Sequence, residues 1–137
     1  MIVLDTDILT LLLHGHKRVT GRRAQTSDEV AITVATRIEI LQGRFASVLK
    51  AENGEKLLLA QRRLVENEKD LEQFTILAID GLVAAEFDRL RHRGLKNIRR
   101  GDLLIACIAL ANKATLVTRN QRDFRQVPGL KLDNWAD

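Results

Sequence analysis

The chain has 137 residues, 45% hydrophobic and 29% charged, with a formal net charge of +4. This length predicts a single domain, residues 1–137, with enough buried surface to fold alone. No apolar stretch approaches the ~20 residues of a membrane span, so we expect no membrane partner. The only cysteine, Cys107, excludes an intrachain disulfide and fits a reducing cytoplasm, the expected location.

The first half of the chain alternates between strand-like and helical patterns. Residues 2–4 predict a strand, and residues 8–13 predict a short helix that ends near Gly15. Residues 17–27 are polar and basic, which favours a loop or a variable helix. The β-branched run 30–34 predicts a second strand, and residues 35–49 predict a helix before the break at Asn53-Gly54.

The second half repeats this alternation. Helical spacing predicts a helix over 56–74, and a strand follows over 75–79. Asp80 is placed to cap a helix over 82–93, which Gly94 would stop. An apolar helix is expected to begin at Asp102, with strands at 115–117 and 130–132. The alternation predicts an α/β fold: a three-layer α/β/α domain with a central, mainly parallel sheet of four to five strands.

Four acidic residues fall near the predicted switch points between strands and helices. Asp5 follows the first strand, and Glu39 lies one turn into the helix after the second strand. Asp102 opens the apolar helix, and Asp123 follows the fourth strand. The carboxyl ends of parallel strands form the ligand-binding edge of an open sheet. Because hard divalent cations prefer oxygen ligands, the set indicates a hard-metal site. A metal bound there can generate a nucleophilic hydroxide and stabilise the charge that develops on a phosphoryl group.

Each acid also has a simpler interpretation. Asp5 can cap the following helix, and an acid such as Asp102 is stabilised in the first turn by the helix dipole. Glu39 can be an exposed residue of an amphipathic helix, and Asp123 can be a turn residue. The four acids together are more specific than any one of them.

Five motifs occur in order along essentially the whole chain: LDTD at 4–7, RIEILQG at 37–43, GDLLIA at 101–106, VTRNQRDF at 117–124 and VPGLKLDNW at 127–135. With these motifs the chain resembles the PIN-domain ribonucleases, in particular the VapC toxins of bacterial toxin–antitoxin pairs. The resemblance implies a PIN-like fold and a metal-dependent endoribonuclease toxin that cleaves structured RNA, such as tRNA or rRNA, by metal-activated water. It also implies a homodimer and neutralisation by a cognate VapB-type antitoxin.

The same resemblance implies roles for individual residues. Asp5 and Asp102 would be the principal ligands of Mg²⁺ or Mn²⁺, and Glu39 would act on the metal or through its waters. Either Asn120 or Asp123 would complete the acidic pocket, and the sequence leaves both open. Supporting residues that would position water or phosphate are Thr6 and Thr118. Asp7 stands where asparagine is often found; it can be an extra ligand or a helix cap, and we favour the cap.

Basic residues cluster before Asp102. They are Arg89, Arg91, Arg93, Lys96, Arg99 and Arg100. Arg99 and Arg100 adjoin the predicted metal ligand, so they are expected to bind the RNA backbone. Aromatic residues make up only 4% of the chain, without tyrosine, which argues against an extended base-stacking platform.

Two other functions are open at this point. A haloacid-dehalogenase-like phosphatase would use Asp5 of the Asp5-Thr6-Asp7 run as a covalent nucleophile. Against this, Leu9 stands where Thr or Val is usual, and no second aspartate follows Asp102 at the expected distance. A PIN-like module that binds RNA or protein without cleavage would have a degraded acidic set, whereas all the acids are present here. The apolar surface of the helix over 56–74 favours a homodimer in any of these cases.

Overall fold

The central sheet has five short strands, all parallel to their neighbours, in the residues that the computed structural model describes, 1–95 and 97–137. The strands are β1 (Ile2–Leu4), β2 (Val30–Thr33), β3 (Thr75–Leu77), β4 (Thr115–Val117) and β5 (Lys131–Asp133). Their order is β3-β2-β1-β4-β5, which places β1 in the centre. The predicted parallel α/β sheet is therefore confirmed. Lys96, named in the basic cluster, lies outside the described residues.

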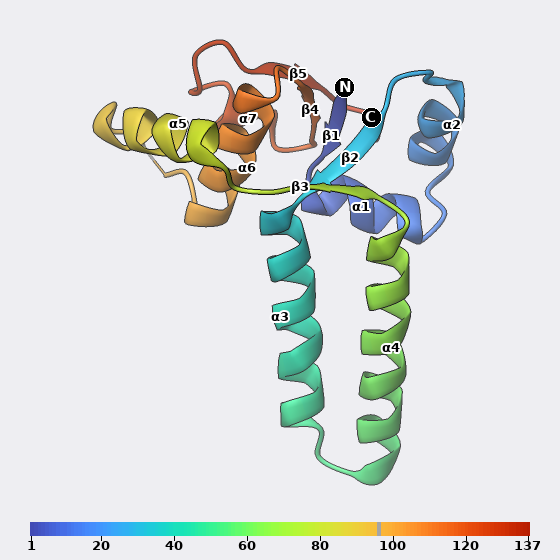
Figure 1. Ribbon diagram of the computed structural model, residues 1–137. Coiled ribbons are helices and arrows are strands. Elements are labelled where there is room, and N and C mark those ends of the chain that lie inside the picture. The colour runs from blue at the N-terminus through green and yellow to red at the C-terminus, as the bar shows by residue number, and fades with distance from the viewer. Residues whose placement is uncertain (96) are drawn as a thin grey trace.

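Helices cover both faces of the sheet. They are α1 (Thr6–Leu13), α2 (Lys17–Gln25), α3 (Val34–Lys50), α4 (Gly54–Glu72), α5 (Gly81–His92), α6 (Arg100–Ala111) and α7 (Gln121–Phe124). Figure 1 shows α5, α6 and α7 on one side and α1 and α2 on the other. Side chains of β1 alternate between the two layers, because successive residues of a strand point to opposite faces. Val3 packs in the core that contains α6, whereas Ile2 and Leu4 pack in the core that contains α1. The predicted three layers are confirmed.

Helices α3 and α4 form an antiparallel pair that projects from the body of the domain (Figure 1). Asn53 caps α4 by accepting a hydrogen bond from the Lys56 N–H, so the predicted break at Asn53-Gly54 is the turn between the two helices. The pair leaves several large apolar side chains exposed, among them Leu49 at 86% and Leu58 at 67%. The predicted surplus of apolar surface on α4 is therefore present.

Several element boundaries differ from the sequence prediction. Of the loop and the helix left open for residues 17–27, the helix is observed: α2 spans Lys17–Gln25 and buries Val19 fully. Helix α6 begins at Arg100 with Arg99 as its N-cap, so Asp102 lies within the first turn instead of opening the helix. The short helix α7 follows β4 and contains Asp123, for which the simpler interpretation was a turn residue. Asp80 caps α5 and Gly94 follows it with a φ of 67°, as predicted. Among the described residues, no helix has the length and apolar character to cross a membrane.

Candidate active site

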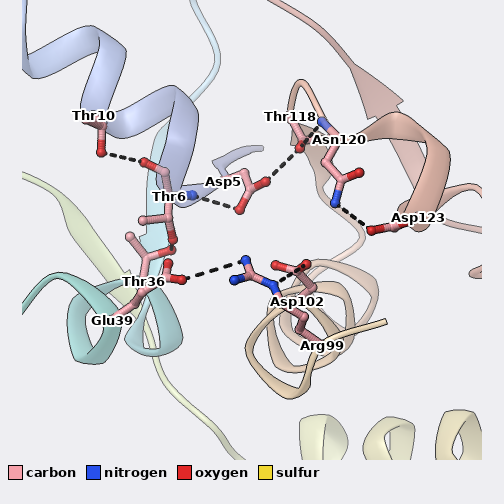
Figure 2. A network of polar contacts seen from close by, with 10 residues as sticks. All are labelled: Asp5, Thr6, Thr10, Thr36, Glu39, Arg99, Asp102, Thr118, Asn120 and Asp123. Atoms are coloured by element: carbon pink, nitrogen blue, oxygen red, sulfur yellow. Dashed lines mark hydrogen bonds and ion pairs between the residues drawn. The ribbon is translucent and has the colours of Figure 1, made fainter. Parts of the chain in front are cut away.

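Three of the four predicted acids meet at the carboxyl edge of the sheet. Asp5 follows β1, Glu39 projects from α3, and Asp102 lies in the first turn of α6 (Figure 2). They line one cavity of about 230 Å³. The cavity is lined by Asp5, Thr6, Asp7, Glu39, Arg99, Asp102 and Asn120. Parallel strands thus bring together side chains that are far apart in the sequence, as the strand-edge argument predicts.

The Asp5 carboxylate is buried and held by two donors. Its side chain is the N-cap of α1: Oδ1 accepts from the Thr6 N–H at 2.8 Å. Oδ2 accepts from the Thr118 hydroxyl at 2.6 Å, and the Thr118 oxygen accepts from the Asn120 N–H at 2.9 Å. The simple capping role and the predicted functional position therefore coexist in one residue. Thr118 is fully buried between these partners, so its contacts position Asp5. Its predicted role in positioning water or phosphate stays a prediction.

Burial makes the ionised form of Asp5 unfavourable. Only 6% of the residue is exposed, and this desolvation raises its pKa from the ordinary value of 3.8 to about 7. The negative charges of Asp7 and Asp102 raise the pKa further, whereas the hydrogen bonds from Thr118 and Thr6 lower it. The pKa of Asp102 is also raised, chiefly by burial, although the neighbouring Arg99 lowers it. The cavity therefore holds two buried carboxyl groups whose charge is poorly compensated.

Arg99 reaches across the cavity between two acids from different helices. Its Nη2 atom lies 3.9 Å from Glu39 Oε1, and its Nε atom lies 3.5 Å from Asp102 Oδ2 (Figure 2). Glu39 itself is half exposed at the mouth of the cavity. Arg100 takes a different direction, because its guanidinium lies over the Phe87 ring at 5.6 Å from the ring centre. The two arginines predicted to bind RNA therefore have different surroundings.

Asn120 and Asp123 lie three residues apart at the edge of the site and are hydrogen-bonded to each other. Asn120 lines the cavity and donates from Nδ2 to Asp123 Oδ2 at 3.0 Å. Asp123 is not among the residues that line the cavity, but its charge contributes to the raised pKa of Asp102. Of the two alternatives, Asn120 is the one that faces the cavity, with Asp123 behind it.

A hydrogen bond between two threonine hydroxyls connects α1 and α3 beside the cavity. The Thr6 hydroxyl hydrogen-bonds the Thr36 hydroxyl at 2.9 Å, which links α1 to α3 (Figure 2). Thr36 was missed by sequence reasoning, and the only available signal was its spacing from the N-cap Thr33, whose hydroxyl accepts from the Thr36 N–H.

Asp7 lies in the first turn of α1, where Asp5 is the cap. The favoured interpretation of Asp7 as the cap is therefore wrong.

The chemistry of the donor set fits a hard divalent cation. Asp5 and Asp102 supply buried oxygens, and a nearby cation would offset the burial and the smaller charge repulsion that raise their pKa values. Mg²⁺ usually takes one or two carboxylates and completes its shell with water. Within residues 1–95 and 97–137, no three His, Cys, Asp or Glu side chains are grouped closely enough to form a ready-made metal cluster. The fit therefore rests on two carboxylates, with Glu39 close to the opening.

Comparisons with known proteins agree with this geometry. Residues 2–130 match the model of the PIN domain, so the chain belongs to the PIN-domain family. It is 29% identical over 140 residues to Ribonuclease VapC2 of Rickettsia felis, covering 97% of this chain and 96% of that one. It is 25% identical over 141 residues to Ribonuclease VapC1 of Haemophilus influenzae strain R2866, covering 98% and 97%.

Solved structures show the same fold. The crystal structure of VapBC2 from Rickettsia felis bound to a promoter DNA fragment matches with a TM-score of 0.76 and 27% identity, over 98% of this chain and 99% of that one. FitAcB from Neisseria gonorrhoeae matches with a TM-score of 0.73 and 27% identity, over 98% and 97%. DNA-bound VapBC from Salmonella typhimurium, at 22% identity and a TM-score of 0.80 over 98% and 97%, supports the fold alone.

Proposed function

We propose that this chain is a ribonuclease toxin of the VapC type, which acts on cytoplasmic RNA and is neutralised by a VapB-type antitoxin. The observation that carries the proposal is the pair of buried carboxylates, Asp5 and Asp102, at the carboxyl edge of a PIN-domain sheet. The relatives from Rickettsia felis and Haemophilus influenzae are named ribonucleases, and structural relatives are VapBC complexes.

The proposed reaction is hydrolysis of a phosphodiester bond with Mg²⁺ or Mn²⁺ as cofactor. Asp5 and Asp102 would hold the ion, and Glu39 would act on it directly or through its waters. A bound ion supplies a nucleophilic water and stabilises the charge that develops on the phosphoryl group. Asp123 would contribute from behind Asn120, chiefly through its charge. Thr118 holds the Asp5 carboxylate in one orientation, so the ligand oxygen is positioned before the ion arrives.

The proposed substrate is a structured RNA, such as tRNA or rRNA, bound mainly through its phosphates. Arg91 and Arg100 lie over the same Phe87 ring, at 5.7 and 5.6 Å from its centre. Neither forms an ion pair with any residue in the described part of the chain. Because stacking holds the guanidiniums while leaving their charge unpaired, this surface suits a phosphate backbone that extends beyond the cavity.

A groove next to the site supports the proposed antitoxin. This groove of about 700 Å³ lies between α1, α3 and α4 and shares Thr6 and Glu39 with the cavity. A peptide segment bound there would approach the acids directly. The exposed apolar side chains of α3 and α4 would provide contact area for the same partner. We further propose a homodimer, for which the exposed Ile79 and Leu82 near the start of α5 provide apolar surface.

The decisive experiment compares cleavage of total cellular RNA by wild type and Asp5→Asn, each with Mg²⁺, Mn²⁺ or EDTA. The matched control is Asp88→Asn, which removes an exposed carboxylate from α5, away from the cavity. Discrete fragments that require a metal, survive in the control and disappear in Asp5→Asn would support the nuclease. Cleavage that persists in EDTA or in Asp5→Asn would contradict it.

The same preparations separate the alternatives. Turnover of a small phosphate ester with RNA left intact would favour a phosphatase with Asp5 as nucleophile. Membership of the PIN-domain family argues against that function. Metal binding without turnover of any offered RNA would favour a non-catalytic binding module.

A further inference from the structure

The side chain of Arg99, the N-cap residue of α6, lines the carboxylate cavity. Arg99 is the N-cap residue of α6 but makes no side-chain capping hydrogen bond. Its guanidinium instead bridges Glu39 on α3 and Asp102 on α6, with N–O distances of 3.9 and 3.5 Å. A cation of this chain therefore lies between two of the four acids that line the cavity.

The two partners of the Arg99–Asp102 ion pair differ in burial, so loss of the pair affects Asp102 more than Arg99. The Arg99 side chain is 74% exposed, whereas the Asp102 side chain is only 7% exposed. Ion pairs with one exposed member and separations near 4 Å contribute little to stability, so Arg99 itself gains little from this contact. The buried Asp102 carboxylate, by contrast, must find another cation when Arg99 leaves, because an unpaired buried charge is strongly unfavourable.

One guanidinium also cannot neutralise all the acids that it serves. Asp102, Glu39 and Asp5 all favour the charged form of Arg99, and Asp102 has the largest effect on its pKa. The pKa of Asp102 nevertheless stays raised. A divalent ion would bring twice the charge of Arg99 to the same carboxylates. Arg99 and a divalent ion held by Asp5 and Asp102 would thus compete for Asp102, and for Glu39 where it acts on the ion.

We propose that Arg99 is the internal counter-cation of the Glu39–Asp102 pair, that a divalent ion displaces it, and that the released guanidinium then binds a phosphate of the RNA substrate. The second half rests on the proposed ribonuclease function, whereas the first half does not. Guanidinium groups bind phosphates through paired, charge-assisted hydrogen bonds. Arg99 released from the acids can therefore bind a phosphate, which is negative like the carboxylates it leaves. Arg99 in this view links loading of the metal site to binding of RNA.

The test measures Mn²⁺ affinity by calorimetry at about pH 8, where the Asp5 carboxyl is mainly ionised. The variants are Arg99→Gln, Arg99→Lys and the matched control Arg89→Gln, which removes a cation paired with Glu86 on the α5 surface. Because a largely exposed ion pair forms only a few times more often than it breaks, removal of Arg99 should tighten Mn²⁺ binding about threefold in Arg99→Gln. Arg99→Lys, which retains the charge, should lie closer to wild type, and Arg89→Gln should be unchanged. Equal or weaker Mn²⁺ binding by Arg99→Gln would overturn the proposal.

Two further readouts separate this inference from the proposed function. In wild type, Mg²⁺ titration should shift the NMR signal of the Arg99 Nε–H group, and Arg89 should show no comparable shift. An Arg99 signal that does not respond to saturating Mg²⁺ would refute displacement, whatever the chain does to RNA. At saturating Mn²⁺, Arg99→Gln should raise the KM for RNA more than it lowers kcat. Tighter Mn²⁺ binding with an unchanged KM would overturn only the proposal that Arg99 binds an RNA phosphate. Absence of RNA cleavage by wild type would count against the proposed function, but it would not contradict the competition between Arg99 and the metal ion.

Discussion

Replacement of Asp5 by Asn should stabilise the folded chain in metal-free buffer, and the effect should grow with pH. The pKa of Asp5 is about 7 in the folded chain against an ordinary value of 3.8, so the folded chain binds the extra proton between these values. The favourable contribution is complete below about pH 4 and is lost as pH rises through about 7. Above that pH the wild type must keep a charged carboxylate in a buried position.

The magnitude follows from the size of the shift. About 3 pKa units at about 1.4 kcal/mol per unit correspond to about 4 kcal/mol of lost stability above pH 7. Asn keeps one acceptor oxygen but gives up one of the two hydrogen bonds from Thr118 and Thr6, which costs about 1 kcal/mol. The net gain in Asp5→Asn is therefore about 3 kcal/mol at pH 8, or about 10 °C in Tm for a chain of this size.

The assay is chemical denaturation followed by circular dichroism, in EDTA, at pH 5 and pH 8. The difference between Asp5→Asn and wild type should grow by about 3 kcal/mol between these pH values. A difference that stays constant would refute the view that burial raises the pKa of Asp5. Saturating Mg²⁺ should remove the advantage of the variant, since a ligand that binds the folded wild type stabilises it by mass action.

Three other outcomes are expected. Thr118→Val removes a donor to the Asp5 carboxylate, so the pH at which Mn²⁺ binding reaches half its maximum should rise by about one unit; an unchanged midpoint would contradict the role of this hydrogen bond. Cys107 is fully buried and its pKa is raised to about 11, so a thiol reagent at pH 8 should react with it only after unfolding, and rapid labelling of the native chain would contradict its burial. Light scattering should give a mass above the 15.5 kDa of one chain, which Leu82→Arg should lower; a wild-type mass of one chain would exclude the homodimer.

The sequence predicts the sheet and its acidic edge well because both depend on local patterns. A β-branched or apolar run followed directly by Asp5 indicates a strand end, and parallel pairing then determines which edge the acid reaches. Helix α2 is less predictable, because its sequence is polar and its position depends on burial of the single residue Val19 against other elements. Strand boundaries differ by a residue or two where helices begin, as at Val34.

The details of the site depend on geometry that the sequence does not carry. The choice between Asn120 and Asp123 is decided by the start of helix α7, which turns Asn120 toward the cavity and leaves Asp123 behind it. Proximity in sequence suggested that Arg99 and Arg100 act alike. The α6 N-terminus separates them instead, because Arg99 is the cap and Arg100 is the first helical residue. Their partners, Glu39 and Phe87, come from other helices.

The strand order also determines when the site comes into existence. Strand β1 is made before its neighbour β4. Thr118, which donates to Asp5, lies 113 residues further along the chain than Asp5. A chain still growing on the ribosome therefore has Asp5 without its buried partner and β1 without one flanking strand. Pairing over such a separation is also slow compared with local helix formation. The proposed nuclease site is therefore complete only after β4 and Thr118 have been made.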